Sequence, residues 1–215
     1  MKEIFSGVFV DGKKLYTMNL VHGSSVYGEK LVKHDGKELR EWVPTRSKLA
    51  AALLNGLKEL NTGKRIMYLG ASTGTTISHV SDIVGEDGVV YAIEFAERVF
   101  RNLVELCKKR KNIVPILADA RKPEEYYWAE ECDMVYCDIA DPQETEIAMR
   151  NANEFLKKGG YIMIAIKSQS IDVTKKPSQV YKEEREKLVK AGFSVLQSVD
   201  LEPYEEKHCM IVAKK

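Results

Sequence analysis

The sequence predicts a doubly wound α/β fold, with a mostly parallel seven-stranded sheet and a small antiparallel β appendage at the N-terminus. From residue 65 onward, short apolar runs of strand character alternate with amphipathic segments of helical period. One run ends in the glycine-containing stretch YLGASTGTT (68–76), and Thr75 then opens a helix-like segment. The next runs end in charged residues, which is typical of a site at the carboxyl edge of a parallel sheet.

The first 45 residues are expected to form the appendage. Two pairs of β-favouring runs are each separated by an Asp-Gly dipeptide, at Asp11–Gly12 and at Asp35–Gly36. Asp-Gly between such runs is a strong hairpin signal. We therefore expect an appendage at 1–45 and a main domain at 46–215. Exposed strand edges in the appendage would also permit a homodimer.

A helix is expected next, because Pro44 and Ser47 precede leucines at near-helical spacing, and Asn61 and Gly63 are expected to end it. The last two strands are joined through Pro203 without room for a crossover helix, so they should pair antiparallel. The strands of the main sheet are expected at 66–69, 89–93, 113–118, 133–138, 160–166, 194–200 and 208–213.

Composition limits the class of protein. A chain of 215 residues with 44% hydrophobic content can bury one α/β core with a small appendage. Membrane-span and signal-peptide patterns are not found, so a cytosolic protein is expected. Four cysteines without C-x-x-C spacing predict reduced thiols, and no metal site is expected. The formal charge of +1 argues against nucleic-acid binding by bulk charge.

The glycines of 68–76 are typical of a loop where a ligand approaches the backbone, or where a turn requires positive φ. Their spacing, Gly70 to Gly74, is neither the dinucleotide fingerprint nor a phosphate loop. Glu94 ends the next apolar run, 24 residues beyond Gly70, near the offset where a carboxylate can hold a ribose diol. A helix-capping role is the alternative for Glu94.

Longer strings resemble the class I methyltransferases that use S-adenosylmethionine, and in detail the archaeal type of the fibrillarin family, which are RNA ribose 2′-O-methyltransferases. The resemblance runs through nearly the whole chain. The strings that carry it are REWVPTRSKLAAAL (40–53), YLGASTGTT (68–76), VYAIEFAER (90–98), PILADAR (115–121), MVYCDIA (134–140), MIAIKSQSID (163–172) and LEPYEEKH (201–208). The Gly-Arg tail of eukaryotic members is not found from Met1 onward, so an archaeal cytoplasm is expected rather than a nucleolus.

The resemblance implies S-adenosylmethionine as cofactor. This molecule carries a sulfonium cation, a ribose diol and an adenine amine but no phosphate, so acids suit it better than a basic cradle. Glu94 should accept from the ribose hydroxyls and Asp119 from the adenine amine, while the helix start at Thr75 suits the methionine carboxylate. The resemblance places Phe95 and Ala120 against the adenine, and a core aromatic is the alternative for Phe95. The expected cofactor-binding residues are Gly70, Ala71, Gly74, Thr75, Thr76, Glu94, Phe95, Asp119, Ala120 and Asp138.

Asp138 and Lys167 are the expected catalytic pair. Each ends a strand, so both should project into a cleft at the carboxyl edge. A free lysine, with a pKa of about 10.4, is protonated at neutral pH and is no base. Either Lys167 orients the 2′-hydroxyl while Asp138 takes its proton, or a second cation, with Lys48 as the candidate, lowers the pKa of Lys167. A structural ion pair between strand ends is the alternative to both.

The resemblance also places His208, at the start of the last strand, by the catalytic cleft. The family pattern has an acid directly before this histidine, whereas Lys207 stands there in this chain. This difference argues against a His–carboxylate relay. A half-exposed histidine without a catalytic role is the alternative.

RNA contact is expected from local cations near aromatic side chains, because the charge balance is close to zero. The expected RNA-binding residues are Arg46, Lys48, Lys175 and Lys176, within a wider patch of Lys30, Lys33, Lys37, Arg40, Tyr27 and Trp42. The basic run 108–111 is expected to complement a helix dipole instead.

The resemblance implies the partners that would recruit RNA. These are a box C/D guide RNA with its target rRNA or tRNA, a Nop-domain scaffold protein and a kink-turn-binding protein. Two alternatives stay open at this point: a small-molecule or protein methyltransferase, and a non-catalytic scaffold subunit.

Overall fold

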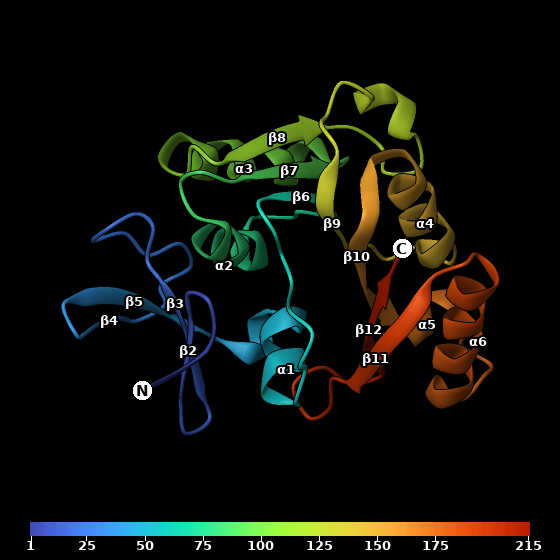
Figure 1. Ribbon diagram of the computed structural model, residues 1–215, viewed down its shortest axis with the longest axis horizontal. Coiled ribbons are helices and arrows are strands. Elements are labelled where there is room, and N and C mark those ends of the chain that lie inside the picture. Colours follow the sequence, from blue (N-terminus) through green and yellow to red (C-terminus); the bar gives the residue numbers. More distant parts are fainter.

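The computed structural model describes residues 1–215 and contains two β-sheets with helices packed on them (Figure 1). The small sheet consists of β1 (Lys2–Phe5), β2 (Val8–Asp11), β3 (Lys14–Met18), β4 (Leu31–His34) and β5 (Lys37–Trp42). The large sheet consists of β6 (Arg65–Leu69), β7 (Val89–Glu94), β8 (Ile113–Leu117), β9 (Cys132–Cys137), β10 (Leu156–Lys167), β11 (Ser194–Asp200) and β12 (His208–Lys214). The helices are α1 (Lys48–Leu54), α2 (Thr75–Val84), α3 (Glu97–Lys109), α4 (Glu144–Phe155), α5 (Ser168–Ile171) and α6 (Pro177–Lys190), with 3-10 turns η1 (Pro44–Arg46) and η2 (Pro123–Tyr126).

The large sheet confirms the predicted fold class. Its order is β11-β12-β10-β9-β6-β7-β8. The neighbours from β10 to β8 are parallel, and β12 is antiparallel to both β10 and β11, as the short connection through Pro203 predicts. None of the helices, of which α6 with 14 residues is the longest, has the length and apolar character that crossing a membrane requires.

The core consists of two apolar layers, one on each face of the large sheet. Successive side chains of a strand point to opposite faces. Ile66 and Tyr68 of β6 therefore pack with α1 and α2, whereas Met67 and Leu69 pack with α4 and α6. Figure 1 shows α1 and α2 on one side of the sheet and α4 and α6 on the other. The strand ends between these layers are left free to form a site.

The small sheet contains both predicted hairpins and one more. Asp35 and Gly36 have φ values of +48° and +76°, as a two-residue turn with two left-handed positions requires. The stretch before Asp11, read from sequence as one β run, is two antiparallel strands, β1 and β2. Gly7, with φ of +75°, allows the chain to reverse between them.

Helix α1 is shorter than predicted. Ser47 is its N-cap and accepts from the backbone N–H of Ala50, but the helix ends at Leu54 instead of continuing toward Asn61. Gly56 follows with φ of +92°, a conformation that ends helices and that the leucine spacing does not reveal. Leu57 is still buried in the core, from extended chain rather than from the helix.

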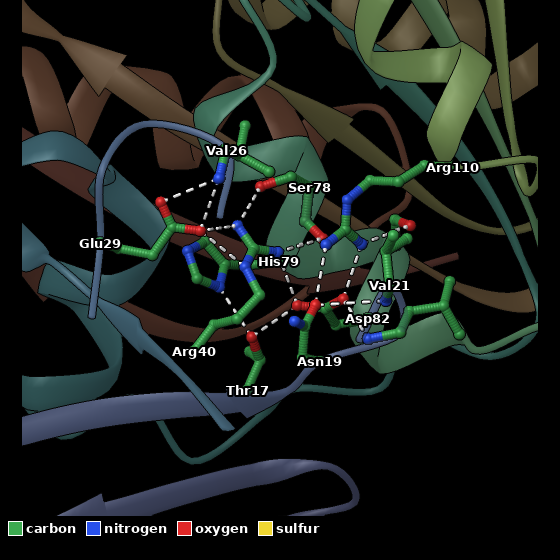
Figure 2. A network of polar contacts seen from close by, with 12 residues as sticks. Thr17, Asn19, Val21, Val26, Glu29, Arg40, Ser78, His79, Asp82 and Arg110 are labelled. Carbon is green, nitrogen blue, oxygen red and sulfur yellow. Dashed lines mark hydrogen bonds and ion pairs between the residues drawn. The ribbon is translucent and has the colours of Figure 1, made fainter. Parts of the chain in front are cut away.

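A buried charge cluster joins the small sheet to the main domain (Figure 2). The Asp82 carboxylate of α2 accepts from the guanidinium groups of Arg40, at 2.8 Å, and Arg110, at 2.6 Å, and from the hydroxyl of Thr17, at 2.7 Å. Arg40 also binds Glu29 through its Nε, at 2.7 Å. Two cations thus face two anions, so burial leaves no uncompensated charge.

Two residues of the expected RNA patch belong to this interior. Arg40 and Trp42 are both fully buried, so their assignment to an RNA-binding surface is wrong. They lie on the same face of β5, turned toward α2, where the Trp42 ring stacks on His79 at 4.8 Å between ring centroids. The acids that neutralise Arg40 are Glu29 and Asp82, 11 and 42 positions away, and the local sequence pattern around Arg40 therefore did not reveal its burial.

His79 completes the cluster as a neutral ring. Its Nδ1 lies 2.7 Å from the Thr17 hydroxyl and its Nε2 lies 2.8 Å from the Tyr27 hydroxyl. Burial, together with the charges of Arg40 and Arg110, holds the pKa of His79 well below its usual range. The ring therefore adds hydrogen bonds but no charge.

The basic run at the end of α3 has two roles. Lys108 and Lys109 occupy its last turn, which confirms the expected dipole complement. Arg110, the next residue, turns inward to Asp82 and is buried.

Replacing Asp82 by alanine should lower the free energy of unfolding by about 3–5 kcal/mol, because it leaves two buried guanidinium groups without their shared partner. Urea denaturation measures this loss. Glu105→Ala is the control: it removes an exposed ion pair with Lys108 and should cost only a small fraction of that amount. Similar losses in the two variants would contradict a stabilising role for the cluster.

Candidate active site

The candidate site lies where the strand order reverses, between the carboxyl ends of β6 and β9. A cavity of about 410 Å³ opens there, and an adjoining hollow of about 170 Å³ lies toward β7. Of the predicted residues, the larger cavity is lined by Arg46, Lys48, Gly70, Ala71, Thr75, Thr76, Asp138, Lys167 and His208, and the hollow by Gly70, Glu94, Phe95, Ala120 and Asp138. Gly70 and Asp138 line both, so the two spaces form one cleft. Gly74, Asp119, Lys175 and Lys176 line neither.

The glycines of the β6–α2 loop are required by close packing. Gly70 has φ of +83°, and a Cβ there would overlap the backbone carbonyl of Asp138. Gly74 has φ of +99°, and a Cβ there would overlap Leu106 of α3. Both glycines therefore have the positive φ that was predicted for this loop. The atoms that an added Cβ would meet belong to Asp138 and Leu106 of the protein itself.

Glu94 holds the glycine loop in place while keeping acceptor capacity. Its carboxylate accepts from the backbone N–H of Ser72, at 2.9 Å, and of Ala96, at 2.8 Å. A carboxylate offers about four acceptor positions, so two hydroxyls can still bind. The contact with Ala96, just before α3, also means that Glu94 fulfils part of the helix-capping alternative.

Phe95 lies at the hollow where adenine was expected, whereas the Asp119 side chain does not. The Phe95 residue is 72% exposed at the rim of the hollow, which excludes the alternative of a core aromatic. Asp119 is bound to the guanidinium of Arg121, at 2.8 Å, which lowers the pKa of Asp119. Its neighbour Ala120 reaches the hollow, but Asp119 is directed to Arg121 instead.

Asp138 forms its ion pair with Lys48. The distance from Lys48 Nζ to Asp138 Oδ1 is 2.6 Å. Burial acts to lower the pKa of Lys48, but the Asp138 carboxylate outweighs it and the pKa is raised. Lys48 is therefore the charged partner of Asp138, which corrects the predicted pairing of Asp138 with Lys167.

Helix α1 delivers Lys48 to the cleft through its N-terminal cap. Ser47 caps the helix, and its hydroxyl also accepts from the Thr76 hydroxyl at the start of α2, at 3.0 Å. Lys48 is the first residue of α1, so this junction fixes its position. The Thr76 hydroxyl is used within the protein, which leaves Thr75 as the more accessible hydroxyl at the helix start.

Lys167 ends β10 on the other side of Asp138. Its backbone N–H donates to the buried carboxyl group of Glu144, at 3.0 Å, and its ammonium forms no ion pair. The ammonium is therefore available to a ligand oxygen in the cleft. Glu144 itself was not singled out from the sequence, where it appears as an ordinary acid in the first turn of a helix.

His208 starts β12 and is buried, which excludes the half-exposed alternative. Its Nδ1 lies 2.7 Å from the backbone carbonyl of Glu206. Because a carbonyl only accepts, Nδ1 carries a hydrogen, and Nε2 of the neutral ring is an acceptor. Glu205 lines the same cavity, although its position after the strand gave no such signal.

The expected RNA-binding cations divide into two groups. Arg46 lines the cavity, and its guanidinium lies 4.8 Å from the centre of the Tyr27 ring. Lys175 lies outside the cleft and is neutralised by Glu183, at 2.7 Å, and by Asp172. Lys176, beside it, precedes α6. Only Arg46 and Lys48 therefore face the site.

No group of three or more His, Cys, Asp or Glu side chains is arranged to hold a metal ion.

Comparisons with known proteins extend over the whole chain. A family model described as Fibrillarin matches residues 1–215. A fibrillarin-like rRNA/tRNA 2′-O-methyltransferase from Methanopyrus kandleri is 51% identical over 98% of this chain and 93% of its own. The solved Aeropyrum pernix fibrillarin with natively bound S-adenosyl-L-methionine is 50% identical, with a TM-score of 0.86 over 93% of this chain and 88% of that one. Fibrillarin in a complex with Nop5p is 41% identical, with a TM-score of 0.89 over 99% of both chains.

Gly70→Ala should destabilise the protein more than Gly12→Ala, although both glycines have positive φ. The left-handed conformation alone costs about 1–2 kcal/mol for a residue with a Cβ. At Gly12 the Cβ meets open space, whereas at Gly70 it overlaps the Asp138 carbonyl. Thermal unfolding of the two variants measures the difference. Equal losses would show that the contact between β6 and β9 tolerates a Cβ.

Proposed function

This chain belongs to the fibrillarin family, and we propose that it methylates ribose 2′-hydroxyls of rRNA and tRNA through Asp138, Lys48 and Lys167. It is an S-adenosylmethionine-dependent RNA 2′-O-methyltransferase of the kind that serves as the catalytic subunit of a box C/D ribonucleoprotein. The observation that carries the assignment of residues is the cleft that joins a lysine–aspartate pair to the glycine loop and Glu94.

The residues of the cleft fit S-adenosylmethionine. The remaining acceptor positions of Glu94 suit the ribose diol, and the exposed ring of Phe95 with the methyl group of Ala120 suits a flat adenine. The start of α2 suits the methionine carboxylate, because its first backbone N–H groups point outward. Asp119 is left out of this set, since Arg121 occupies its carboxylate.

When bound, S-adenosylmethionine supplies a methyl group on a sulfonium centre that a hydroxyl oxygen can attack. A hydroxyl is a poor nucleophile until its proton is accepted. Lys48 occupies Oδ1 of Asp138, so Oδ2 is the acceptor that receives the proton. The unpaired ammonium of Lys167 orients the same oxygen from the end of β10. Because Lys48 is committed to Asp138, this division of roles is favoured over a neutral Lys167.

Nε2 of His208 and the guanidinium of Arg46 are the remaining polar groups that the site offers to RNA. Nε2 is free to accept, because Nδ1 binds the Glu206 carbonyl. Arg46 is held over Tyr27 at the rim, where it can meet a phosphate. A hydrogen bond to the His208 Nε2 and a phosphate contact by Arg46 complete the proposed site, with Lys48 beside them as the partner of Asp138.

A Nop-domain protein is the scaffold partner, as in the complex of the related fibrillarin with Nop5p. We propose that guide RNA and a kink-turn-binding protein complete the particle in an archaeal cytoplasm. The formal charge of +1 and the neutralised Lys175 support recruitment through partners over strong RNA binding by the free chain. Methyl incorporation into target RNA should require guide RNA and the Nop-domain protein. Incorporation into protein or a small molecule without them would favour the alternative methyltransferases.

A homodimer through the small sheet is a further proposal, because β1 and β4 are its edges and each pairs on one side only. Light scattering of the isolated chain tests it. A mass that stays at 24.4 kDa across concentrations would reject it.

Glu94→Ala should weaken binding of S-adenosylmethionine by about 10- to 100-fold, because two charge-assisted hydrogen bonds are lost. Isothermal titration calorimetry measures the dissociation constant. Asp119→Ala is the matched control and should change it less than about threefold, since Asp119 faces Arg121. An equal loss in Asp119→Ala would return that carboxylate to the adenine site.

Lys167→Ala should reduce methylation by about 10²- to 10⁴-fold while leaving the dissociation constant of S-adenosylmethionine nearly unchanged. Single-turnover methyl transfer in the reconstituted particle measures the rate. Lys175→Ala removes a lysine that is paired outside the cleft and should retain activity. Retained activity in Lys167→Ala would remove Lys167 from the mechanism.

A further inference from the structure

Glu144 is a buried acid directly behind the catalytic cleft. It is the first residue of α4, yet its side chain turns inward and the residue is only 1% exposed. One carboxyl oxygen, Oε1, accepts from the backbone N–H of Lys167 at 3.0 Å. The other oxygen, Oε2, is buried without a hydrogen-bond partner. None of the proposed catalytic steps uses this group.

The contact replaces a missing strand at the end of β10. Strand β9 pairs with β10 only as far as Cys137, opposite Ile164. Beyond that point β9 supplies no carbonyl to the last residues of β10, and the N–H of Lys167 is bound by Glu144 instead. Strand β12 pairs with Lys167 on one side, at His208, and α4 binds its N–H on the other through Glu144.

We propose that Glu144 is a positioning residue that holds Lys167 in the cleft, and that it does so as an uncharged carboxylic acid. The proposal rests on the catalytic role given to Lys167 above.

The surroundings of Glu144 favour the uncharged form. Asp138 after β9 and Glu184 on α6 bring negative charge, and the thiol of Cys137 donates to the backbone of Glu144 rather than to its carboxyl group. Lys48 on α1 attracts the charged form, but its ammonium is bound to Asp138.

Burial is the largest influence on Glu144 and raises its pKa to about 9. The start of α4 favours a negative charge only weakly compared with this burial. At neutral pH Glu144 thus accepts the Lys167 N–H through a neutral carbonyl oxygen, as a glutamine would.

Ionisation of Glu144 would disturb the site. A carboxylate without a cation must either move toward water, draw Lys48 away from Asp138, or draw Lys167 out of the cleft. Activity should therefore fall as the pH rises through about 9.

Stability should respond over a wider pH range. In the unfolded chain the Glu144 carboxyl loses its proton near pH 4.5, whereas in the folded protein it keeps the proton up to about pH 9. The free energy of unfolding should therefore fall as the pH rises between these two values.

The test compares Glu144→Gln, which keeps a neutral acceptor, with Glu144→Met, which has similar length and no acceptor. In the reconstituted particle, Glu144→Gln should keep kcat at pH 7 within about twofold, and Glu144→Met should lose about 10²-fold with unchanged affinity for S-adenosylmethionine. Between pH 8 and 10, Glu144→Gln should lose less activity than the native enzyme. Glu154→Gln is the control: it changes an exposed acid on the same helix, and its alkaline loss of activity should persist.

Two measurements on the isolated chain do not depend on activity. Hydrogen exchange at the Lys167 amide should be faster in Glu144→Met and unchanged in Glu144→Gln. The Tm of Glu144→Gln should exceed that of the native protein more at pH 8 than at pH 5, and this comparison stands even where Glu144→Met does not fold.

Native kcat and native Lys167 protection in Glu144→Met would overturn the positioning role. Coincident pH profiles and Tm values for Glu144→Gln and the native protein would overturn the uncharged state. Fast exchange in Glu144→Met together with an active Lys167→Ala would instead leave the positioning contact intact and remove the catalytic role of Lys167.

Discussion

The close contact between the ends of β6 and β9 is the constraint on which the cleft depends. The backbone N–H of Asp138 donates to the carbonyl of Leu69, at 3.0 Å, and Gly70 allows the two chains to meet without a Cβ between them. The chain then leaves β6 toward α2 and leaves β9 toward α4, on opposite faces of the sheet. The cleft is the space between the two segments that follow β6 and β9, and the close contact between the strand ends places Asp138 in it.

Much of the architecture was predictable because it follows from local patterns. The positions of the strands and the hairpins come from apolar periodicity, short connections and turn residues such as Asp35–Gly36. Where prediction failed, a single conformation or a distant partner decided the outcome. Gly56 ended α1 within a run of well-spaced leucines, and Arg40 was buried because Asp82, 42 positions further along the chain, neutralises it.

In the candidate site, too, local patterns predicted some features and contacts with distant residues decided the others. The rule that parallel strands end at one edge was enough to bring Glu94, Asp138 and Lys167 to a common cleft. It could not decide which ammonium pairs with Asp138, because that depends on how the Ser47 cap joins α1 to α2 and so delivers Lys48. Nor could it show that Glu144 turns away from solvent, since its sequence position is that of an ordinary exposed acid.

The charge cluster behind the small sheet has a consequence for heat. The hydration of charged groups becomes less favourable as temperature rises, so the penalty for keeping Arg40, Glu29, Asp82 and Arg110 out of water shrinks. Hydrophobic stabilisation per unit area levels off over the same range. The contact between the two sheets should therefore contribute an increasing fraction of the free energy of unfolding as the temperature rises. We expect the small sheet to unfold together with the main domain and not before it.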